Sequence, residues 1–140
     1  MKFLLGFCIT AVLSLCRETT VHFVQHSHMD AGWLKSYDEY YWQWVRHIFD
    51  SVFAELKKDP QYTYTLGDIA FFRRYYFDLP SDADRFAIKK LVTNGQLEFV
   101  QGGYVSPDEA TTNYADVLLN YEAGHNFLRE EFGVTPRAAW

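Results

Sequence analysis

Cysteine is nearly absent from this chain, which has only Cys8 and Cys16 among its 140 residues. Both lie in the first 16 residues, so residues 17–140 have no thiol from which a disulfide framework could form. Lysine and arginine never form a run longer than a pair, and the formal net charge is -5. Because the basic patch of a nucleic-acid-binding protein is missing, we expect no nucleic-acid partner.

A long hydrophobic run is also missing, because the apolar residues 3–15 are too few to span a bilayer comfortably. This run follows Lys2 and ends at the small residues Ser14 and Cys16, after which residues 17–20 restore polarity. That order is typical of a cleaved signal peptide, to which we assign residues 1–16, although a buried N-terminal helix or strand is the alternative. We therefore expect a protein of the secretory pathway, with no membrane anchor after cleavage.

Low-complexity linkers and internal repeats are absent from residues 17–140, so we expect one domain. The hydrophobic content of 49% and the aromatic content of 19% are enough to bury a core. The sequence pattern predicts strands at residues 21–26, 61–66, 97–101 and 137–140, and helices at residues 40–57, 69–77, 83–93 and 114–132. This alternation predicts an α/β fold with a parallel sheet, either open and doubly wound or closed into a barrel.

Three side chains able to bind a metal follow the first predicted strand. His26, His28 and Asp30 occupy alternate positions, and an extended backbone places such positions on one side of the chain. Imidazole nitrogen and carboxylate oxygen suit a borderline cation such as zinc, and Trp33 offers a flat apolar face of the kind that packs against a sugar ring. The simpler alternative is that these histidines form hydrogen bonds at the end of a buried strand.

Polar or glycine-rich residues also follow the second and third predicted strands, at Gly67-Asp68 and at Gly102-Gly103-Tyr104. In parallel α/β folds, ligands bind where the strands end. The sequence therefore predicts one pocket built from three strand ends.

Four motifs occur in order along the chain, at residues 26–35 (HSHMDAGWLK), 38–41 (DEYY), 68–72 (DIAFF) and 101–110 (QGGYVSPDEA). Together with residues 132–140, they resemble the beginning of the class II alpha-mannosidases, glycoside hydrolase family 38. The resemblance covers nearly all of residues 17–140. Four ordered motifs are far more specific than a single metal-ligand pair.

The resemblance implies a zinc-dependent retaining glycosidase that removes terminal alpha-D-mannose from glycans. Its catalytic domain would be a seven-stranded parallel α/β barrel, with residues 17–140 as the N-terminal portion. The family's zinc ligands correspond to His28 and Asp30, and Trp33 matches the aromatic residue that forms the floor of the mannose site. His26 corresponds to no family ligand, so the resemblance removes it from the set of three.

Other positions of the resemblance carry weaker expectations. Asp68 and Asp108 lie in recurring motifs, and we interpret them as supporting residues. Met29 and Ala31 differ from the family's usual residues, and Met29 beside Asp30 is expected to weaken zinc binding at most modestly.

The resemblance also indicates what these residues lack. The family's nucleophilic aspartate is expected a few residues after Trp140, and its general acid and a further histidine zinc ligand beyond that. We therefore assign no catalytic residue here, and expect the 140-residue chain to be an inactive fragment that needs the remainder of the polypeptide to complete the barrel. Only 25 residues precede His26, too few for the anchor and stem of Golgi relatives, so a lysosomal or secreted enzyme is expected.

Two other functions remain open from the sequence. A metal-dependent amidohydrolase or deacetylase on an α/β barrel would use both His26 and His28 to bind the metal and activate water. A non-catalytic carbohydrate-binding protein would keep zinc and Trp33 without the chemistry. The first alternative differs from the mannosidase at His26, and the second at the residues expected after Trp140.

Overall fold

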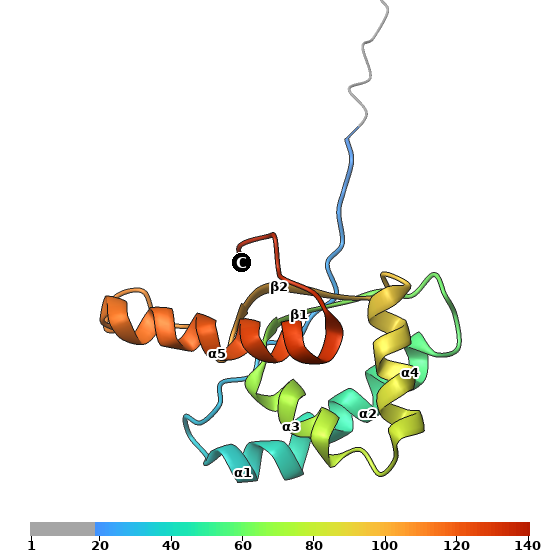
Figure 1. Cartoon of the computed structure of the whole chain (residues 1–140), viewed down its shortest axis with the longest axis horizontal. Helices are drawn as coiled ribbons and strands as arrows, with labels where there is room; N and C mark the ends of the chain where they lie inside the picture. The colour runs from blue at the N-terminus through green and yellow to red at the C-terminus, as the bar shows by residue number, and fades with distance from the viewer. Residues whose placement is uncertain (1–18) are drawn as a thin grey trace, which may run out of the picture.

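The fold is built on two parallel strands joined by helices. A computed structural model of the chain (Figure 1) describes residues 19–140, so the signal peptide expected at residues 1–16 lies outside the described residues. Strand β1 (Tyr64–Asp68) pairs in parallel with β2 (Leu97–Gly103), and α3 (Ala70–Asp78) and α4 (Asp82–Thr93) connect them. The α/β class is thus confirmed, while this two-stranded sheet does not show the expected seven-stranded barrel.

The first helical region begins earlier than the sequence pattern predicts. Helix α1 (Tyr37–Tyr40) continues through a π-helical segment, Tyr41–Val45, into α2 (Arg46–Leu56). Ser36 fixes the start, because its Oγ accepts from the backbone N–H of Glu39 while its own N–H donates to the Glu39 carboxylate. Trp44, expected on the apolar face of this helix, keeps 45% of its surface exposed.

Phe72 of α3 lies at the centre of an aromatic core. It is fully buried, and its ring centroid lies 5.3 Å from that of Phe99 on β2 and 5.6 Å from that of Phe132. The other aromatic rings in contact with it are Phe49, Phe53, Tyr76 and Phe127. Helix α5 (Tyr114–Phe132) packs along β2, and Gly133, with φ +68°, ends it in a left-handed turn.

The predicted strands at residues 21–26 and 137–140 are wrong as regular strands. Each segment makes one backbone hydrogen bond to the sheet: Thr65 N–H donates to the Gln25 carbonyl at 2.8 Å, and Gln101 N–H donates to the Ala138 carbonyl at 2.7 Å. Within residues 19–140 each segment has a neighbour on one side only, and its side chains stay exposed, as in Phe23 at 82%. The two segments nevertheless lie along β1 and β2 respectively, where a wider sheet would continue.

Gln96 links the C-terminal end of α2 to the start of β2, away from the predicted pocket. Its side chain is buried, and Nε2 donates to the carbonyl oxygens of Leu56, the last residue of α2, and of Asp59, just after that helix, at 2.8 and 3.0 Å. Carbonyl groups that would lack partners at the helix end are thereby satisfied at the start of β2.

Within residues 19–140, no helix has the length and apolar character needed to cross a membrane.

Candidate functional site

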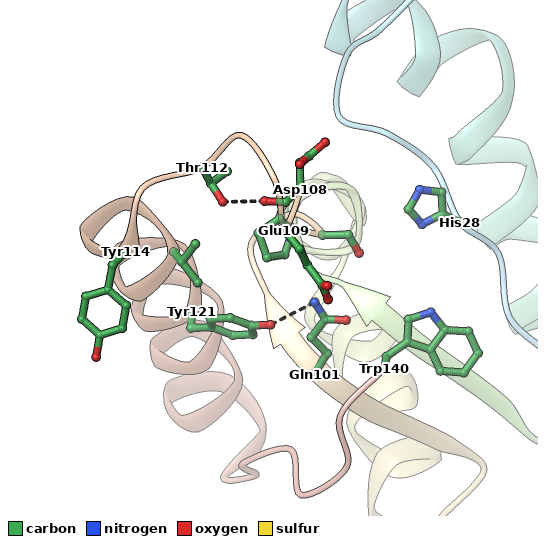
Figure 2. A pocket seen from close by; sticks show the side chains of 11 residues that line it. His28, Gln101, Asp108, Glu109, Thr112, Tyr114, Tyr121 and Trp140 are labelled. Atoms are coloured by element: carbon green, nitrogen blue, oxygen red, sulfur yellow. Dashed lines mark hydrogen bonds between the residues drawn. The ribbon is translucent and has the colours of Figure 1, made fainter.

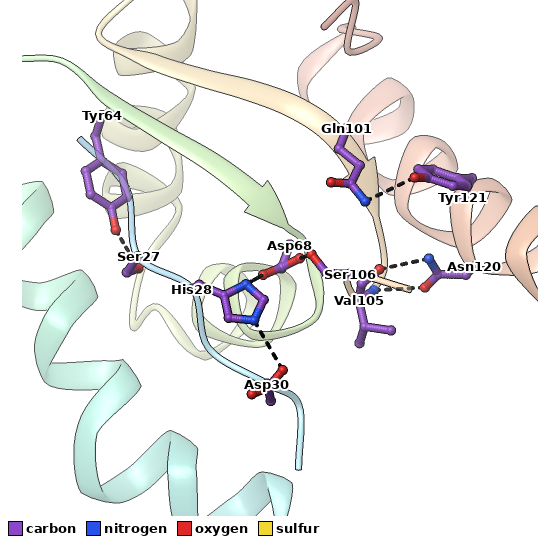
Figure 3. Close-up of polar contacts among 10 residues, drawn as sticks. All are labelled: Ser27, His28, Asp30, Tyr64, Asp68, Gln101, Val105, Ser106, Asn120 and Tyr121. Atoms are coloured by element: carbon purple, nitrogen blue, oxygen red, sulfur yellow. Dashed lines mark hydrogen bonds and ion pairs between the residues drawn. The ribbon is translucent and has the colours of Figure 1, made fainter. Parts of the chain in front are cut away.

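The segment carrying His28 is fixed to β1 by its neighbours. The Tyr64 hydroxyl donates to Ser27 Oγ at 2.5 Å, and Thr65 holds the Gln25 carbonyl as described above. Burial raises the pKa of Tyr64, so its hydroxyl stays protonated as a donor. These two contacts place His28 beside the C-terminal end of β1, as the strand-end rule predicts (Figure 3).

The imidazole of His28 lies between two carboxylates. Its Nε2 is 3.2 Å from Asp30 Oδ1, and its Nδ1 is 3.4 Å from Asp68 Oδ2. Asp68 is the last residue of β1, and the Ser106 hydroxyl donates to its other oxygen, Oδ1. Figure 3 shows these contacts joining three stretches of chain that are far apart in sequence.

His28 Nε2 and Asp30 Oδ1 are in hydrogen-bonding contact, 3.2 Å apart. Imidazole nitrogen and carboxylate oxygen are both zinc donors, and two donors on a tetrahedral zinc ion are separated by about 3.3–3.5 Å. The observed 3.2 Å between Nε2 and Oδ1 is slightly shorter than that separation and is also a hydrogen-bond distance. Within residues 19–140, no group of three or more His, Cys, Asp or Glu side chains is placed to hold a metal, so a zinc site at His28 and Asp30 would need further ligands.

His26, the third ligand suggested by the spacing, is engaged elsewhere. Its ring packs edge-on against the indole of Trp140, with centroids 4.4 Å apart and an interplanar angle of 67°. The structure therefore brings together His28 and Asp30 but leaves His26 in an aromatic contact. The amidohydrolase alternative, which needs both histidines on the metal, gains no support from this arrangement.

A cavity of about 560 Å³ opens beside His28 (Figure 2). His28 and Trp140 line one side, and the loop after β2 and one face of α5 line the rest, with Gln101, Asp108, Glu109 and Tyr121 among the lining side chains. Trp33, expected at the sugar site, does not line this cavity, and its side chain is 76% exposed. Polar groups beside one indole face are the usual lining of a sugar-binding pocket.

An unusual backbone conformation turns the chain at the floor of this cavity. Gln101 has φ +56° and Gly102 has φ +76°, both in the left-handed region that non-glycine residues rarely adopt. His125 Nε2 donates to the Gln101 carbonyl at 2.8 Å, and Gln101 Nε2 donates to the Tyr121 hydroxyl at 3.0 Å. A Cβ on Gly102 would lie 2.5 Å from Pro136, so glycine is required there.

The loop that carries Ser106 and Asp108 is held by short-range and long-range hydrogen bonds. The side-chain amide of Asn120 on α5 both donates to and accepts from the backbone of Val105, at 2.8 Å each. The Asp108 carboxylate accepts from the backbone N–H groups of Ala110 and Thr111, which lowers its pKa. Asp108 therefore shapes the loop, whereas Asp68 contacts His28 directly.

Sequence reasoning did not identify Ser106, Gln101 and Tyr121 as site residues. Ser106 and Gln101 flank the Gly102-Gly103 strand end, which was a usable signal for a loop at the pocket but not for a contact with Asp68. Tyr121 occupies an ordinary helix position, and only the packing of α5 on β2 brings it to the cavity. No local sequence pattern distinguishes such a residue from a surface tyrosine.

Comparison with known proteins gives consistent results. The alpha-mannosidase of Canavalia ensiformis is 41% identical over 131 residues, covering 88% of this chain and 13% of that protein. The lysosomal alpha-mannosidase of Dictyostelium discoideum is 41% identical over 128 residues, covering 86% of this chain and 13% of that protein. Alpha-mannosidase 2 of Homo sapiens is 37% identical over 120 residues, covering 86% of this chain and 10% of that protein.

A solved structure shares the fold. A glycosyl hydrolase family 38 protein from Enterococcus faecalis superposes with a TM-score of 0.65 at 23% identity, over 83% of this chain and 13% of that one. This chain spans only about one eighth of the length of the relatives that it matches. The N-terminal domain of glycosyl hydrolases family 38 matches residues 18–140, and the chain belongs to this family.

Proposed function

We propose that the polypeptide containing this chain is a zinc-dependent retaining alpha-mannosidase that releases terminal alpha-D-mannose from glycans. Family membership and the three alpha-mannosidases named above support the reaction. The observation that carries the metal requirement is the approach of His28 Nε2 to Asp30 Oδ1, 3.2 Å, beside a cavity at the strand ends.

His28 and Asp30 are the residues of this chain that would hold zinc. A bound zinc ion would orient two neighbouring mannose hydroxyls and stabilise negative charge there as the sugar ring distorts. Both side chains are about half exposed, 50% and 47%, so a metal ion can reach the donor atoms from solvent without rearrangement of the core. The remaining zinc ligands are expected from other parts of the polypeptide.

The cavity supplies groups suited to a sugar. The Tyr121 oxygen accepts from Gln101, so the Tyr121 O–H is directed elsewhere and can donate to a sugar hydroxyl. Glu109 adds a carboxylate acceptor, and Trp140 adds an apolar ring face. Trp33 remains proposed as the mannose platform. Retention of stereochemistry would require a carboxylate nucleophile, for which we propose an aspartate following Trp140.

We further propose that the enzyme works in the secretory pathway, in the lysosomal lumen or outside the cell. The name of the Dictyostelium relative supports a lysosomal setting, and the order of charged, apolar and small residues at 1–16 supports an exported protein. Its partners would be mannose-containing glycans, and the remainder of the polypeptide would complete a seven-stranded α/β barrel around the site.

The test is turnover of a chromogenic alpha-mannoside by the full-length polypeptide, with and without a chelator. We expect turnover that a chelator abolishes and zinc restores, and we expect His28→Ala and Asp30→Ala each to remove it. His26→Ala is the matched control and should keep most of the zinc binding.

Three outcomes would count against this proposal. Turnover that is unaffected by the chelator would exclude the metal requirement. Loss of zinc binding in His26→Ala would favour the amidohydrolase instead. Mannose binding without any turnover would indicate the non-catalytic carbohydrate-binding protein.

A further inference from the structure

His28 has one carboxylate at each ring nitrogen, and the two differ in their surroundings. Asp30, at 3.2 Å from Nε2, has 47% of its side chain exposed, whereas Asp68, at 3.4 Å from Nδ1, has only 16% exposed. A neutral imidazole carries a single N–H, which can be donated to only one of these partners. The carboxylate that accepts this N–H determines which ring nitrogen keeps its lone pair.

We infer that Asp68 is a positioning residue for His28: its carboxylate accepts a hydrogen bond from Nδ1–H, which leaves the Nε2 lone pair for a metal ion held together with Asp30. The inference rests on the proposed zinc site, because only a metal ligand requires the lone pair on that nitrogen. Metal-binding histidines commonly donate their second N–H to a carboxylate, which fixes the tautomer and the ring orientation. Here that carboxylate comes from the end of β1, 40 residues from its partner in sequence.

Burial explains why Asp68, and not Asp30, accepts the hydrogen bond from the ring N–H. Water can satisfy the exposed Asp30 carboxylate, but Asp68 has little access to water and needs partners within the protein. The Ser106 hydroxyl supplies one donor, at Oδ1. An Nδ1–H on His28 would face Oδ2 at 3.4 Å and supply a second donor, so that each oxygen of Asp68 has a donor beside it only in this tautomer.

Asp68 is also held more firmly than Asp30. It lies within the sheet, opposite Gly103 of β2, while Asp30 belongs to an irregular segment. Ser106 is held in turn, because Asn120 of α5 makes two hydrogen bonds to the adjacent Val105. A continuous series of contacts therefore runs from α5 through the loop after β2 to the ring of His28 (Figure 3).

The first test measures the zinc affinity of the full-length polypeptide by calorimetry, because further zinc ligands are expected from outside this chain. Asp68→Ala should weaken zinc binding by about 10–100-fold, and Asp68→Asn and Ser106→Ala should each weaken it less, because they keep part of the series of contacts. Asp50→Ala is the matched control: Asp50 likewise accepts from a hydroxyl, that of Tyr75, and its loss changes the charge equally but should leave zinc affinity unchanged. Affinities of both Asp68 variants within about two-fold of the wild type would overturn the inference.

The second test needs no metal. At about pH 8.5, where imidazole is ordinarily neutral, ¹⁵N NMR of the zinc-free chain should show the His28 proton on Nδ1, and Asp68→Ala should shift it to Nε2. Asp68→Asn, which preserves the size of the side chain, serves if the alanine variant fails to fold. A full-length wild-type polypeptide that binds no zinc would refute the metal site, whereas a proton on Nε2 in the wild type would refute the role of Asp68.

Discussion

In the aromatic core around Phe72 the side chains are almost fully buried, whereas at the strand-end site His28 and Asp30 keep about half of their surface exposed. The core is stabilised by nonpolar burial, which grows with the area removed from water. The site depends on a few directional contacts between exposed or half-buried polar groups, which add little stability. The difference indicates that stability and function in this chain are carried by separate sets of residues.

The largest effect is expected from Phe72→Ala, which tests whether the aromatic core carries the stability of the chain. We expect a loss of about 3–5 kcal/mol in the free energy of unfolding, because the change leaves a cavity among six aromatic rings. Urea denaturation followed by tryptophan fluorescence measures it. Phe86→Ala is the control, since Phe86 is 70% exposed and its loss should cost less than about 0.5 kcal/mol. Equal losses would show that the core is not centred on Phe72.

A second test lies where the core meets the site, at Gly124. A Cβ there would lie 2.1 Å from the Gly102 carbonyl oxygen, so Gly124→Ala should destabilise by about 1–3 kcal/mol. Helix propensity alone predicts the opposite sign, a gain of about 1 kcal/mol. Thermal unfolding distinguishes a loss of stability from a gain. Ala123→Gly, at the exposed neighbouring position, should follow propensity and lose about 1 kcal/mol.

A smaller effect on stability is expected at the site itself. His28→Ala should change the free energy of unfolding by no more than about 1 kcal/mol, because both contacts of His28 with carboxylates involve a half-exposed ring. The same variant should lose zinc binding, so that calorimetry shows a large effect of the substitution and denaturation a small one. A loss of stability comparable to that of Phe72→Ala would remove the proposed separation between core and site.

The smallest effect concerns the pH dependence of the loop after β2. Backbone N–H groups of Ala110 and Thr111 lower the pKa of Asp108 in the folded chain. Its contribution to stability is therefore present above the ordinary carboxyl pKa of about 3.9 and is lost as the pH falls through the lower folded value. NMR titration of the Ala110 amide should show a midpoint below that ordinary value, and Asp108→Asn should abolish the transition. A midpoint at or above it would contradict the assigned contacts.

Local signals predicted most of the regular elements. Residues 114–132 were predicted as a helix and form α5 with the same bounds, because Asn113 caps its start and Gly133 ends it. Helix α4 likewise lies between Ser81 and Asn94, within one residue of its predicted start. Each of these signals acts between residues a few positions apart, so the sequence alone contains the required information.

Predictions failed where the outcome depends on distant neighbours. Residues 21–26 have strand-like composition but make a single backbone hydrogen bond to β1, because a strand forms fully only when partners lie beside it. Trp44 has helical apolar spacing but lies outside the buried face, which passes through Tyr41, Val45 and Phe49. Burial depends on which side of a helix the rest of the chain covers.

At the site, the sequence by itself determined that the side chains of His28 and Asp30 lie close together, because they are two residues apart on an extended backbone. Only the tertiary structure decided that Asp68 and Ser106 lie behind the imidazole and that His26 packs against Trp140. The parallel pairing of β1 with β2 and the packing of α5 on β2 bring distant residues to one edge of the sheet. Those contacts depend on the register and on the core, which no local pattern of residues encodes.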